Sequence, residues 1–350
     1  MTYIKPAFHH PSLKKNKVGY LKSDYLGVVS TLCAGCGHDS ISGAIVQACY
    51  EINLKPHHLA KLSGIGCSSK TPTYFLSNSH GFNSVHGRMP SITTGANMAN
   101  KDMIYMGVSG DGDTASIGMG QFVHAIRRNL NMVYIVMNNG CYGLTKGQDS
   151  ATADLGSISK AGSDNPYPPV DLAGMALELG ATFVARSFSG DKSQLVPLIK
   201  AAMSHHGFAL LDVISPCVTF NNNQGSTKSY SFVREYNEAV SAVDFVPEEK
   251  PIEIDYEEGS MQEVELFDGT KISLKKVAPD WDPFDRYGAI RRLHKDINDK
   301  HIATGLLYIN THRKDLHEML NTSDKPFNKM KEDELCPGND VLQTINDQFR

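Results

Sequence analysis

Residues 110–143 read GDGDTASIGMGQFVHAIRRNLNMVYIVMNNGCYG, and this stretch decides the fold. A short apolar run at 103–108 precedes it and a second lies inside it at 132–137, each bounded by turn residues, so both predict buried strands. The segment between them predicts a helix, because it ends in two arginines, where cations suit the helix dipole, and has apolar residues at Ile117, Phe122, Ala125 and Ile126. Strand, helix and strand in this order predict a parallel pair within an α/β fold.

Polar loops follow the ends of these two predicted strands. Gly110, Asp111 and Gly112 come after the first strand, and Asn139 comes after the second. Ligands of an open parallel sheet bind at the carboxyl ends of its strands, so neighbouring strands would set Asp111 beside Asn139. Carboxylate and amide oxygens suit Mg²⁺, and the glycines let the backbone approach a phosphate. The loops therefore predict a magnesium-diphosphate site.

A GDG turn alone is weak evidence, because glycine and aspartate also occur in ordinary strand–helix turns. The pair Asn138-Asn139 strengthens the prediction, since Asn139 lies 28 residues after Asp111 at the next predicted strand end. GDG followed by about 25 to 30 residues and NN resembles the signature of thiamine diphosphate enzymes. We therefore expect thiamine diphosphate held through Mg²⁺.

Length and composition exclude several classes of protein. The chain has 350 residues, 41% hydrophobic and 21% charged, which suffices for a substantial core. A net charge of −4 argues against nucleic-acid binding. No apolar run approaches the roughly 20 residues that cross a bilayer, and the first residues contain no apolar signal segment. We expect a cytoplasmic protein that is not bound to a membrane.

The cysteines raise a second question of chemistry. An odd number of cysteines argues against a disulfide framework, and the seven are Cys33, Cys36, Cys49, Cys67, Cys141, Cys217 and Cys336. Cys33 and Cys36 form a CxxC before a predicted helix, while Cys67 and Cys217 each follow a predicted strand. Four thiolates could therefore gather near the diphosphate. Their spacing leaves an iron–sulfur cluster and a zinc site equally open, beside a redox pair or unrelated buried thiols.

The rest of the chain predicts three regions. Residues 1–30 form an N-terminal arm, and residues 31–240 form the cofactor domain, with alternating strands and helices up to about residue 215 and a long loop at 144–170. Residues 241–350 form an irregular C-terminal extension for subunit contact, with a small hairpin turning at Asp268-Gly269. The alternation favours a doubly wound, mostly parallel sheet.

Eight motifs occur in a telling order: CAGCGH, GIGCSSK, HGR, TGAN, GDGD, HAIRRN, NNGCYGLTKGQ and SPCVTFNN. Together they resemble the β subunit of 2-oxoacid:ferredoxin oxidoreductases, most closely the 2-oxoglutarate type, over about residues 25–235. The resemblance implies the diphosphate-binding domain of the thiamine diphosphate-binding fold. It also implies thiamine diphosphate, Mg²⁺ and one [4Fe-4S] cluster on this chain.

The resemblance assigns residues to each group. The implied cluster ligands are Cys33, Cys36, Cys67 and Cys217. The implied magnesium ligands are Asp111, Asn139 and the backbone carbonyl of Cys141. The residues implied to line thiamine diphosphate are Ile65, Gly66, Cys67, Ser68, His86, Gly112, Asp113, Gly143 and Leu144.

The implied reaction is the coenzyme A-dependent oxidative decarboxylation of 2-oxoglutarate to succinyl-CoA and CO₂, reversible, with electrons passed through the cluster to ferredoxin. Thiamine diphosphate serves as the electron sink, and a nearby cluster accepts single electrons. A pyruvate or broad 2-oxoacid enzyme is the alternative within the family. A non-redox thiamine-dependent lyase and a structural zinc-binding subunit are the alternatives outside it.

Three side chains are candidates for direct catalytic or substrate contacts. His86 either contacts the cofactor or substrate, or is a satisfied structural histidine. Lys70 and Lys146 are hypothesised to hold the substrate's carboxylates, although loop lysines are usually only solvated. Arg88 is a further available cation.

No motif identifies the glutamate that thiamine enzymes need to tautomerise the aminopyrimidine ring. In the family this group comes from a second polypeptide, the α subunit. We therefore expect the active site at an interface in an αβ or (αβ)₂ assembly, with coenzyme A mostly on the partner side and this chain inactive alone.

Overall fold

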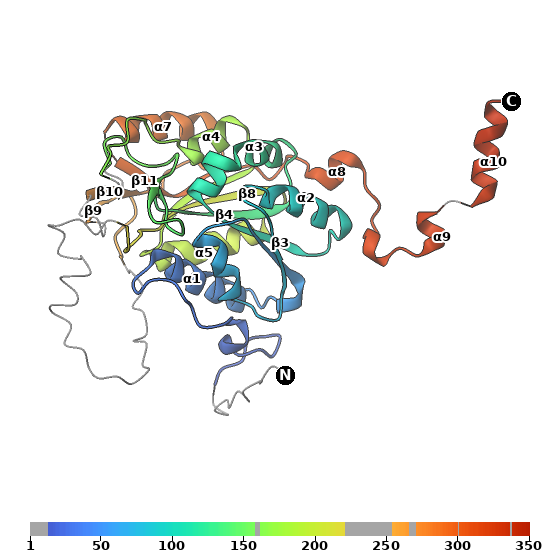
Figure 1. Cartoon of the computed structure of the whole chain (residues 1–350), viewed down its shortest axis with the longest axis horizontal. Coiled ribbons are helices and arrows are strands. Elements are labelled where there is room, and N and C mark those ends of the chain that lie inside the picture. The colour runs from blue at the N-terminus through green and yellow to red at the C-terminus, as the bar shows by residue number, and fades with distance from the viewer. Residues whose placement is uncertain (1–12, 158–161, 221–253, 266–270, 300, 337) are drawn as a thin grey trace.

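The computed structural model of the chain describes residues 13–157, 162–220, 254–265, 271–299, 301–336 and 338–350. A nine-stranded sheet runs through it in the order β2–β1–β3–β4–β8–β7–β11–β10–β9 (Figure 1). The first six of these strands are parallel to one another. They are β2 (His80–Asn83), β1 (Leu59–Ser63), β3 (Ile104–Gly110), β4 (Met132–Asn138), β8 (Phe208–Ile214) and β7 (Phe183–Phe188). The predicted α/β fold with a mostly parallel sheet is confirmed.

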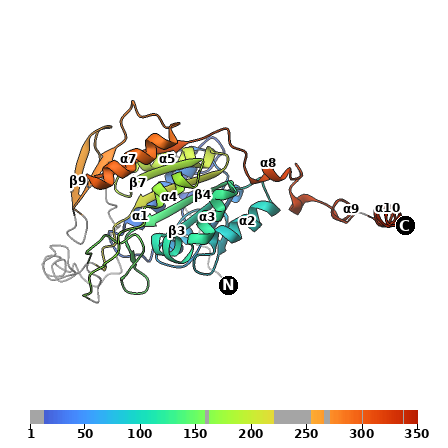
Figure 2. The same cartoon turned by 90° about the horizontal axis from the view of Figure 1, so that it is seen from above.

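Helices cover both faces of the sheet (Figures 1 and 2). One face carries α1 (Gly37–Glu51) and α5 (Lys192–Ser204), whose apolar residues pack with Tyr25 into one core cluster. The other face is covered by α2 (Met89–Ala99), α3 (Met119–Arg127), α4 (Leu172–Glu178) and α7 (Arg286–Asn298). β4 and β8 are buried along nearly their whole length because both of their faces are covered, which is why their sequences read as continuous apolar runs.

The decisive stretch folds as predicted, with one local difference. β3 and β4 are neighbours in register, so Gly110 pairs with Met137 and the two polar loops emerge side by side. The residues between β3 and α3 form a π-helix over Gly112–Ile117, a wider turn that is frequent at functional sites. Ile117, expected on the apolar face of the helix, is instead 43% exposed, because it ends this turn before α3 begins.

The C-terminal part is more regular than the sequence suggests. β9 (Met261–Glu265), β10 (Lys271–Lys276) and β11 (His301–Ile309) continue the main sheet, and β11 pairs antiparallel with β7. The expected irregular extension is therefore corrected, since pairing with β11 satisfies the edge of β7. The predicted Asp268-Gly269 turn lies outside the described residues. The boundaries at 30 and 240 stay a prediction.

Trp281, the single tryptophan of the chain, connects two elements of this C-terminal part, β11 and α7. Its Nε1 donates to the carbonyl of Leu307 on β11 at 3.2 Å. The guanidinium of Arg292 on α7 lies over its ring at 5.6 Å from the centroid. One side chain therefore contacts both the last strand and the helix that packs on it.

The last described residues extend away from this body (Figures 1 and 2). α8 (Leu316–Leu320) is still held to it, because His317 Nε2 and Asn97 Oδ1 are 2.9 Å apart. Beyond it lie η5 (Phe327–Lys329), α9 (Glu332–Leu335) and α10 (Asn339–Gln348). All described side chains of 331–350 are exposed.

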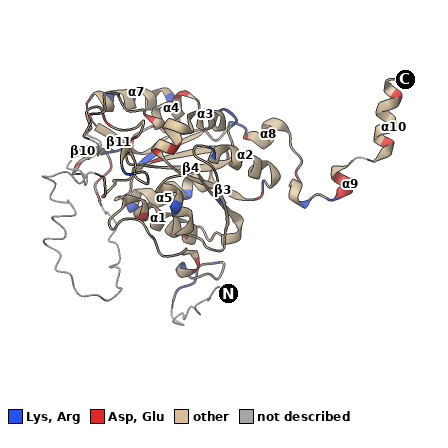
Figure 3. Ribbon diagram, viewed as in Figure 1, with Lys and Arg blue, Asp and Glu red and all other residues tan. Residues whose placement is uncertain are grey.

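Acidic and basic residues are interspersed along the described ribbon in Figure 3. Within the described segments, no helix has both the length and the apolar composition that crossing a bilayer requires.

Candidate functional site

A cavity lies at the carboxyl ends of β1, β3 and β4. The loops after β1, β2, β3 and β4 supply most of its lining, and His38 of α1 adds to it. All residues implied to line thiamine diphosphate, and all three implied magnesium ligands, are among its lining residues: Ile65, Gly66, Cys67, Ser68, His86, Asp111, Gly112, Asp113, Asn139, Cys141, Gly143 and Leu144. The structure thus gathers on one cavity the residues that the sequence singled out, and their roles stay predictions.

Asp111 is buried at the end of β3 with neutral donors around it. Its Oδ1 accepts from the backbone N–H of Asn139 at 3.3 Å. Its Oδ2 accepts from the hydroxyls of Ser150 and Thr152, the latter at 2.6 Å. Burial raises the pKa of Asp111, although these donors oppose the shift. Within the described residues no lysine or arginine pairs with this carboxylate, so a bound cation would find an uncompensated charge.

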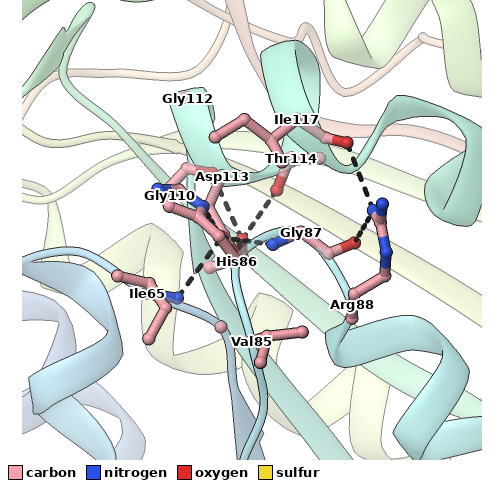
Figure 4. A network of polar contacts seen from close by, with 12 residues as sticks. Ile65, Val85, His86, Gly87, Arg88, Gly110, Gly112, Asp113, Thr114 and Ile117 are labelled. Atoms are coloured by element: carbon pink, nitrogen blue, oxygen red, sulfur yellow. Dashed lines mark hydrogen bonds and ion pairs between the residues drawn. The ribbon is translucent and has the colours of Figure 1, made fainter.

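Asp113 binds the neighbouring loops together (Figure 4). Its Oδ1 accepts from the backbone N–H groups of Gly87 at 2.7 Å and Ile65 at 3.3 Å, and from Nδ1 of His86. Its Oδ2 accepts from the hydroxyl of Ser109 at 2.6 Å. Because Nδ1 of His86 faces a carboxylate, that nitrogen carries the proton and Nε2 is left as an acceptor. Asp113 therefore fixes both the orientation and the tautomer of His86.

The packing around position 112 explains why this residue is a glycine. A Cβ on Gly112 would lie 2.4 Å from Cε1 of Tyr142, which is far inside contact distance. The hydroxyl of Tyr142 donates to the carbonyl of Gly112 at 3.2 Å. Glycine is thus required for the ring to cross the turn, and Tyr142 itself lines the cavity.

The four predicted cluster cysteines lie close to one another beside this cavity. Cys36 precedes α1, and the charges of Cys33 and Cys217 act on its thiol. The charges of Cys33 and Cys217 also act on the thiol of Cys67. The sulfurs of Cys67 and Cys217 lie 3.3 and 3.7 Å from the position that a Cβ would take at Gly143. Burial raises the pKa of the Cys36 and Cys67 thiols, so a bound metal would have to stabilise their thiolates.

Cys141 adds a fifth thiol to this group. It donates a hydrogen bond to Cys217, which raises the pKa of Cys141 and lowers that of Cys217. The sequence assigned only the backbone carbonyl of Cys141, and nothing in the sequence pattern indicated this thiol contact. All seven cysteines are free.

Within the described parts of the chain, no three side chains of His, Cys, Asp and Glu converge tightly enough to hold a single metal ion. A four-iron cluster differs from a single ion, because each cysteine binds a different iron. The predicted magnesium ligands include an amide and a backbone carbonyl, which such a set does not contain. The buried Asp111 and the adjacent thiols fit the predicted groups in their chemistry, and both metal centres stay predictions.

The candidate lysines lie outside the lining of the cavity. Lys70 is half-buried on the turn after Cys67, and its charge acts on that thiol. Lys146 is exposed at the tip of the hairpin formed by β5 (Cys141–Tyr142) and β6 (Gln148–Asp149), with φ of 83°. Arg88 is exposed, and its Nη1 lies 3.4 Å from the carbonyls of Gly87 and Ile117. Lys70 is therefore the less exposed of the two lysines.

Comparisons with known proteins agree with this geometry. Residues 64–213 match the family model described as "Thiamine pyrophosphate enzyme, C-terminal TPP binding domain". The β subunit of a 2-oxoacid:ferredoxin oxidoreductase from Saccharolobus solfataricus is 40% identical over 224 residues, which are 63% of this chain and 70% of that relative. The chain belongs to the family of 2-oxoacid:ferredoxin oxidoreductase β subunits. The predicted family is confirmed.

Two other relatives refine the position of this β subunit within the family. The 2-oxoglutarate oxidoreductase subunit KorB of Mycobacterium tuberculosis is 42% identical over 194 residues, or 54% of this chain and about half (51%) of that relative. The 2-oxoglutarate synthase subunit KorB of Methanocaldococcus jannaschii is 36% identical over 234 residues, or 65% of this chain and 82% of that relative.

A solved structure covers nearly the whole chain. It is a 2-oxoglutarate:ferredoxin oxidoreductase from Magnetococcus marinus with 2-oxoglutarate, coenzyme A and succinyl-CoA bound. The two chains superpose with a TM-score of 0.72 at 28% identity, over 97% of this chain and 98% of the other. The described C-terminal strands of this β subunit are therefore part of a fold that a solved relative shares over almost its full length.

Proposed function

We propose that this chain is the β subunit of a 2-oxoglutarate:ferredoxin oxidoreductase that forms succinyl-CoA and CO₂ and passes the electron pair to ferredoxin. The single observation that carries the proposal is the cavity at the sheet edge, where residues from four separate loops meet: Cys67, His86, Asp111 and Asn139. The KorB names of two relatives and the 2-oxoglutarate bound to the solved relative support this substrate over pyruvate.

Each group of residues has a proposed part in the reaction. Asp111, Asn139 and the carbonyl of Cys141 would hold Mg²⁺ and, through it, the diphosphate, while Gly112 allows close approach of the backbone. Cys33, Cys36, Cys67 and Cys217 would hold one [4Fe-4S] cluster, and the free cysteines fit a reducing cytoplasm. Bound thiamine diphosphate supplies the carbanion-stabilising chemistry of decarboxylation.

His86 and Lys70 are proposed to act on the substrate side. Asp113 holds the imidazole with Nε2 as an acceptor at the cavity, so His86 can hold a proton donated by substrate or cofactor. Lys70 stands beside Cys67, where its ammonium can attract a substrate carboxylate. Lys146 stays a second candidate for the same role.

A partner chain is part of the proposal. The β-subunit family implies an α subunit, and we expect it to supply the ring-tautomerising glutamate and most of the coenzyme A site. An αβ or (αβ)₂ assembly would then place the cavity at the interface between the chains.

The test is an anaerobic assay of the co-purified α and β chains against a panel of 2-oxoacids. We expect reduction of ferredoxin that requires both 2-oxoglutarate and coenzyme A, and none from the β chain alone. Replacing both Lys70 and Lys146 by alanine should raise the Michaelis constant for 2-oxoglutarate more than that for pyruvate. Turnover by the single chain, or preference for pyruvate, would contradict the proposal.

A further inference from the structure

A continuous set of polar contacts runs behind the cavity and ends at Asp111. It begins at Arg186 on β7, whose Nε donates to Oδ2 of Asp212 on β8 at 3.0 Å. The other oxygen of Asp212 accepts from Nδ2 of Asn138 at 3.0 Å. Oδ1 of Asn138 then lies 3.0 Å from the hydroxyl of Thr152, which is also 2.6 Å from Oδ2 of Asp111. The contacts join three neighbouring strands, β4, β8 and β7, to the loop that follows β6.

The chemistry of these groups allows only one orientation for the amide of Asn138. Asp212 is an ionised carboxylate held by Arg186, so it can only accept hydrogen bonds. The amide nitrogen of Asn138 must therefore face Asp212, and its oxygen must face Thr152. The first asparagine of the NN pair thus has a fixed acceptor pointed at the Thr152 hydroxyl, while Asn139 faces the cavity.

Arg186 makes the far end of this set rigid. Its guanidinium is buried and pairs with both Asp212 and Asp171. Burial alone would lower the pKa of Arg186, but the two carboxylates more than offset it and raise the pKa. Asp171 is also the N-cap of α4, where it accepts from the N–H of Ala173 at 3.2 Å. An arginine with two carboxylate partners cannot turn without leaving a buried charge unpaired.

At the near end, the hydroxyls select which oxygen of Asp111 stays available. Oδ2 accepts from both Ser150 and Thr152, while Oδ1 has one backbone contact at 3.3 Å. The guanidinium of Arg186 pairs with the carboxylates of Asp171 and Asp212. Within the described residues, the buried carboxylate of Asp111 has only neutral donors as partners. The set therefore carries excess negative charge at the end that meets the cavity, where a divalent cation would compensate it.

We propose that Thr152 is a positioning residue for the cation site. Its single hydroxyl proton is shared between Oδ2 of Asp111, the nearer acceptor, and the fixed Oδ1 of Asn138, so that Oδ1 of Asp111 stays available to the predicted Mg²⁺. The inference rests on the proposed function, since it assigns these residues to the predicted magnesium site. Groups that orient a metal-binding carboxylate typically change metal affinity by about tenfold to a hundredfold when they are removed.

The test measures cation affinity rather than turnover. The co-purified α and β chains are stripped of divalent cations, supplied with saturating thiamine diphosphate and titrated with Mn²⁺, whose free ion is counted by electron paramagnetic resonance. We expect Thr152→Val to weaken Mn²⁺ binding about tenfold or more, because it removes the hydroxyl at constant shape. Thr152→Ser should stay within about threefold of the wild type, because it keeps the hydroxyl.

Two further variants distinguish an effect on the position of Asp111 from a general loss of structure. Asn138→Ala should change Mn²⁺ binding by less than Thr152→Val, because it removes only the competing acceptor and leaves the hydroxyl proton for Asp111. Thr93→Val is the control for loss of a threonine hydroxyl. Thr93 is buried, whereas Thr152 is half-buried, and it donates only within α2, to the carbonyl of Met89 at 2.8 Å and toward its sulfur. Its affinity for Mn²⁺ should be that of the wild type.

Each contrary result has a definite meaning. Unchanged Mn²⁺ affinity in Thr152→Val overturns the proposal, and so does an equal loss in the valine and serine variants. In both cases the cation site itself would stand, provided that the wild-type assembly binds Mn²⁺ with thiamine diphosphate. A wild-type assembly that binds neither would contradict the proposed function and this inference with it.

Discussion

The two sides of the cavity are built differently. On the oxygen side, Asp113 accepts four hydrogen bonds and Asp111 accepts three, all from groups of this chain. On the sulfur side, Cys33 accepts from the hydroxyl of Thr219 at 2.7 Å. Cys36 and Cys217 accept from backbone N–H groups, and the thiols also lie near one another. The oxygen side is therefore held by seven hydrogen bonds to two carboxylates, and we expect the predicted cluster to add the main links on the sulfur side.

The largest effect should come from breaking the sulfur side. Cys67→Ser should remove most of the iron and sulfide, expected at about four of each per β chain, and with them the 2-oxoglutarate-dependent reduction of ferredoxin. Iron and sulfide analysis of the anaerobically purified assembly measures this. Cys336→Ser is the control, because Cys336 is an exposed free thiol. Full iron content in Cys67→Ser would remove Cys67 from the ligand set.

The oxygen side can be divided by one matched pair of changes. Asp111→Ala should weaken Mn²⁺ and thiamine diphosphate binding more than a hundredfold and change the melting temperature little, because its hydroxyl donors can turn to other acceptors. Asp113→Ala should instead cost about 3–5 kcal/mol of stability, since it leaves two backbone N–H groups and His86 without their acceptor. Calorimetry and cofactor titration of both variants give the comparison. If the two variants lost stability and cofactor affinity to the same extent, Asp111 and Asp113 would not have the separate roles described here.

His86 tests whether the oxygen side also takes part in turnover. His86→Ala should lower kcat about tenfold to a hundredfold while iron content and cation affinity stay close to those of the wild type. The reason is that the imidazole lines the cavity with Nε2 free to accept. Steady-state kinetics with 2-oxoglutarate measures the effect. An unchanged kcat would leave His86 as a structural partner of Asp113.

The smallest expected effect concerns His205, which lies away from the cavity and makes the stability of the fold depend on pH. Burial lowers the pKa of His205 to about 4, and its Nε2 lies 2.8 Å from the hydroxyl of Thr182. Between pH 6.5 and 4 the unfolded chain binds the proton and the folded chain does not, so stability falls as pH falls through this window. We expect a loss of about 1–2 kcal/mol. His205→Gln should flatten this slope in urea unfolding curves measured at pH 7 and pH 5, and an unchanged slope would contradict the assignment.

The sequence predicted the parts of the molecule that depend on local pattern. The runs at 103–108 and 132–137 lie in β3 and β4, and the polar ends of those strands meet as expected. Asp171 and Asp191 directly precede helices α4 and α5 and cap them with their side chains, and aspartate before a helix is a start signal that can be read from sequence. The family motifs then led to the residues that line the cavity.

Features that depend on distant pairs were not predicted. Asn138 and Asp212 are 74 residues apart in the sequence, and no local rule joins them. β11 pairs with β7 across more than a hundred residues, which explains why the C-terminal part looked irregular. Lys61 lies buried in β1, where a lysine argues against burial. It is accommodated because Nζ donates to the carbonyls of Phe75 at 2.6 Å and Leu76 at 3.0 Å, and burial lowers the pKa of Lys61 to about 8.

Trp281 supplies this molecule with its own optical reporter. It is the single indole of the chain, bonded to β11 and stacked under Arg292 of α7, and it is absent from the lining of the cavity. Its emission should therefore shift to longer wavelength when the C-terminal strands detach. A fluorescence trace beside a calorimetric one would reveal whether the last three strands melt together with the rest of the sheet or before it.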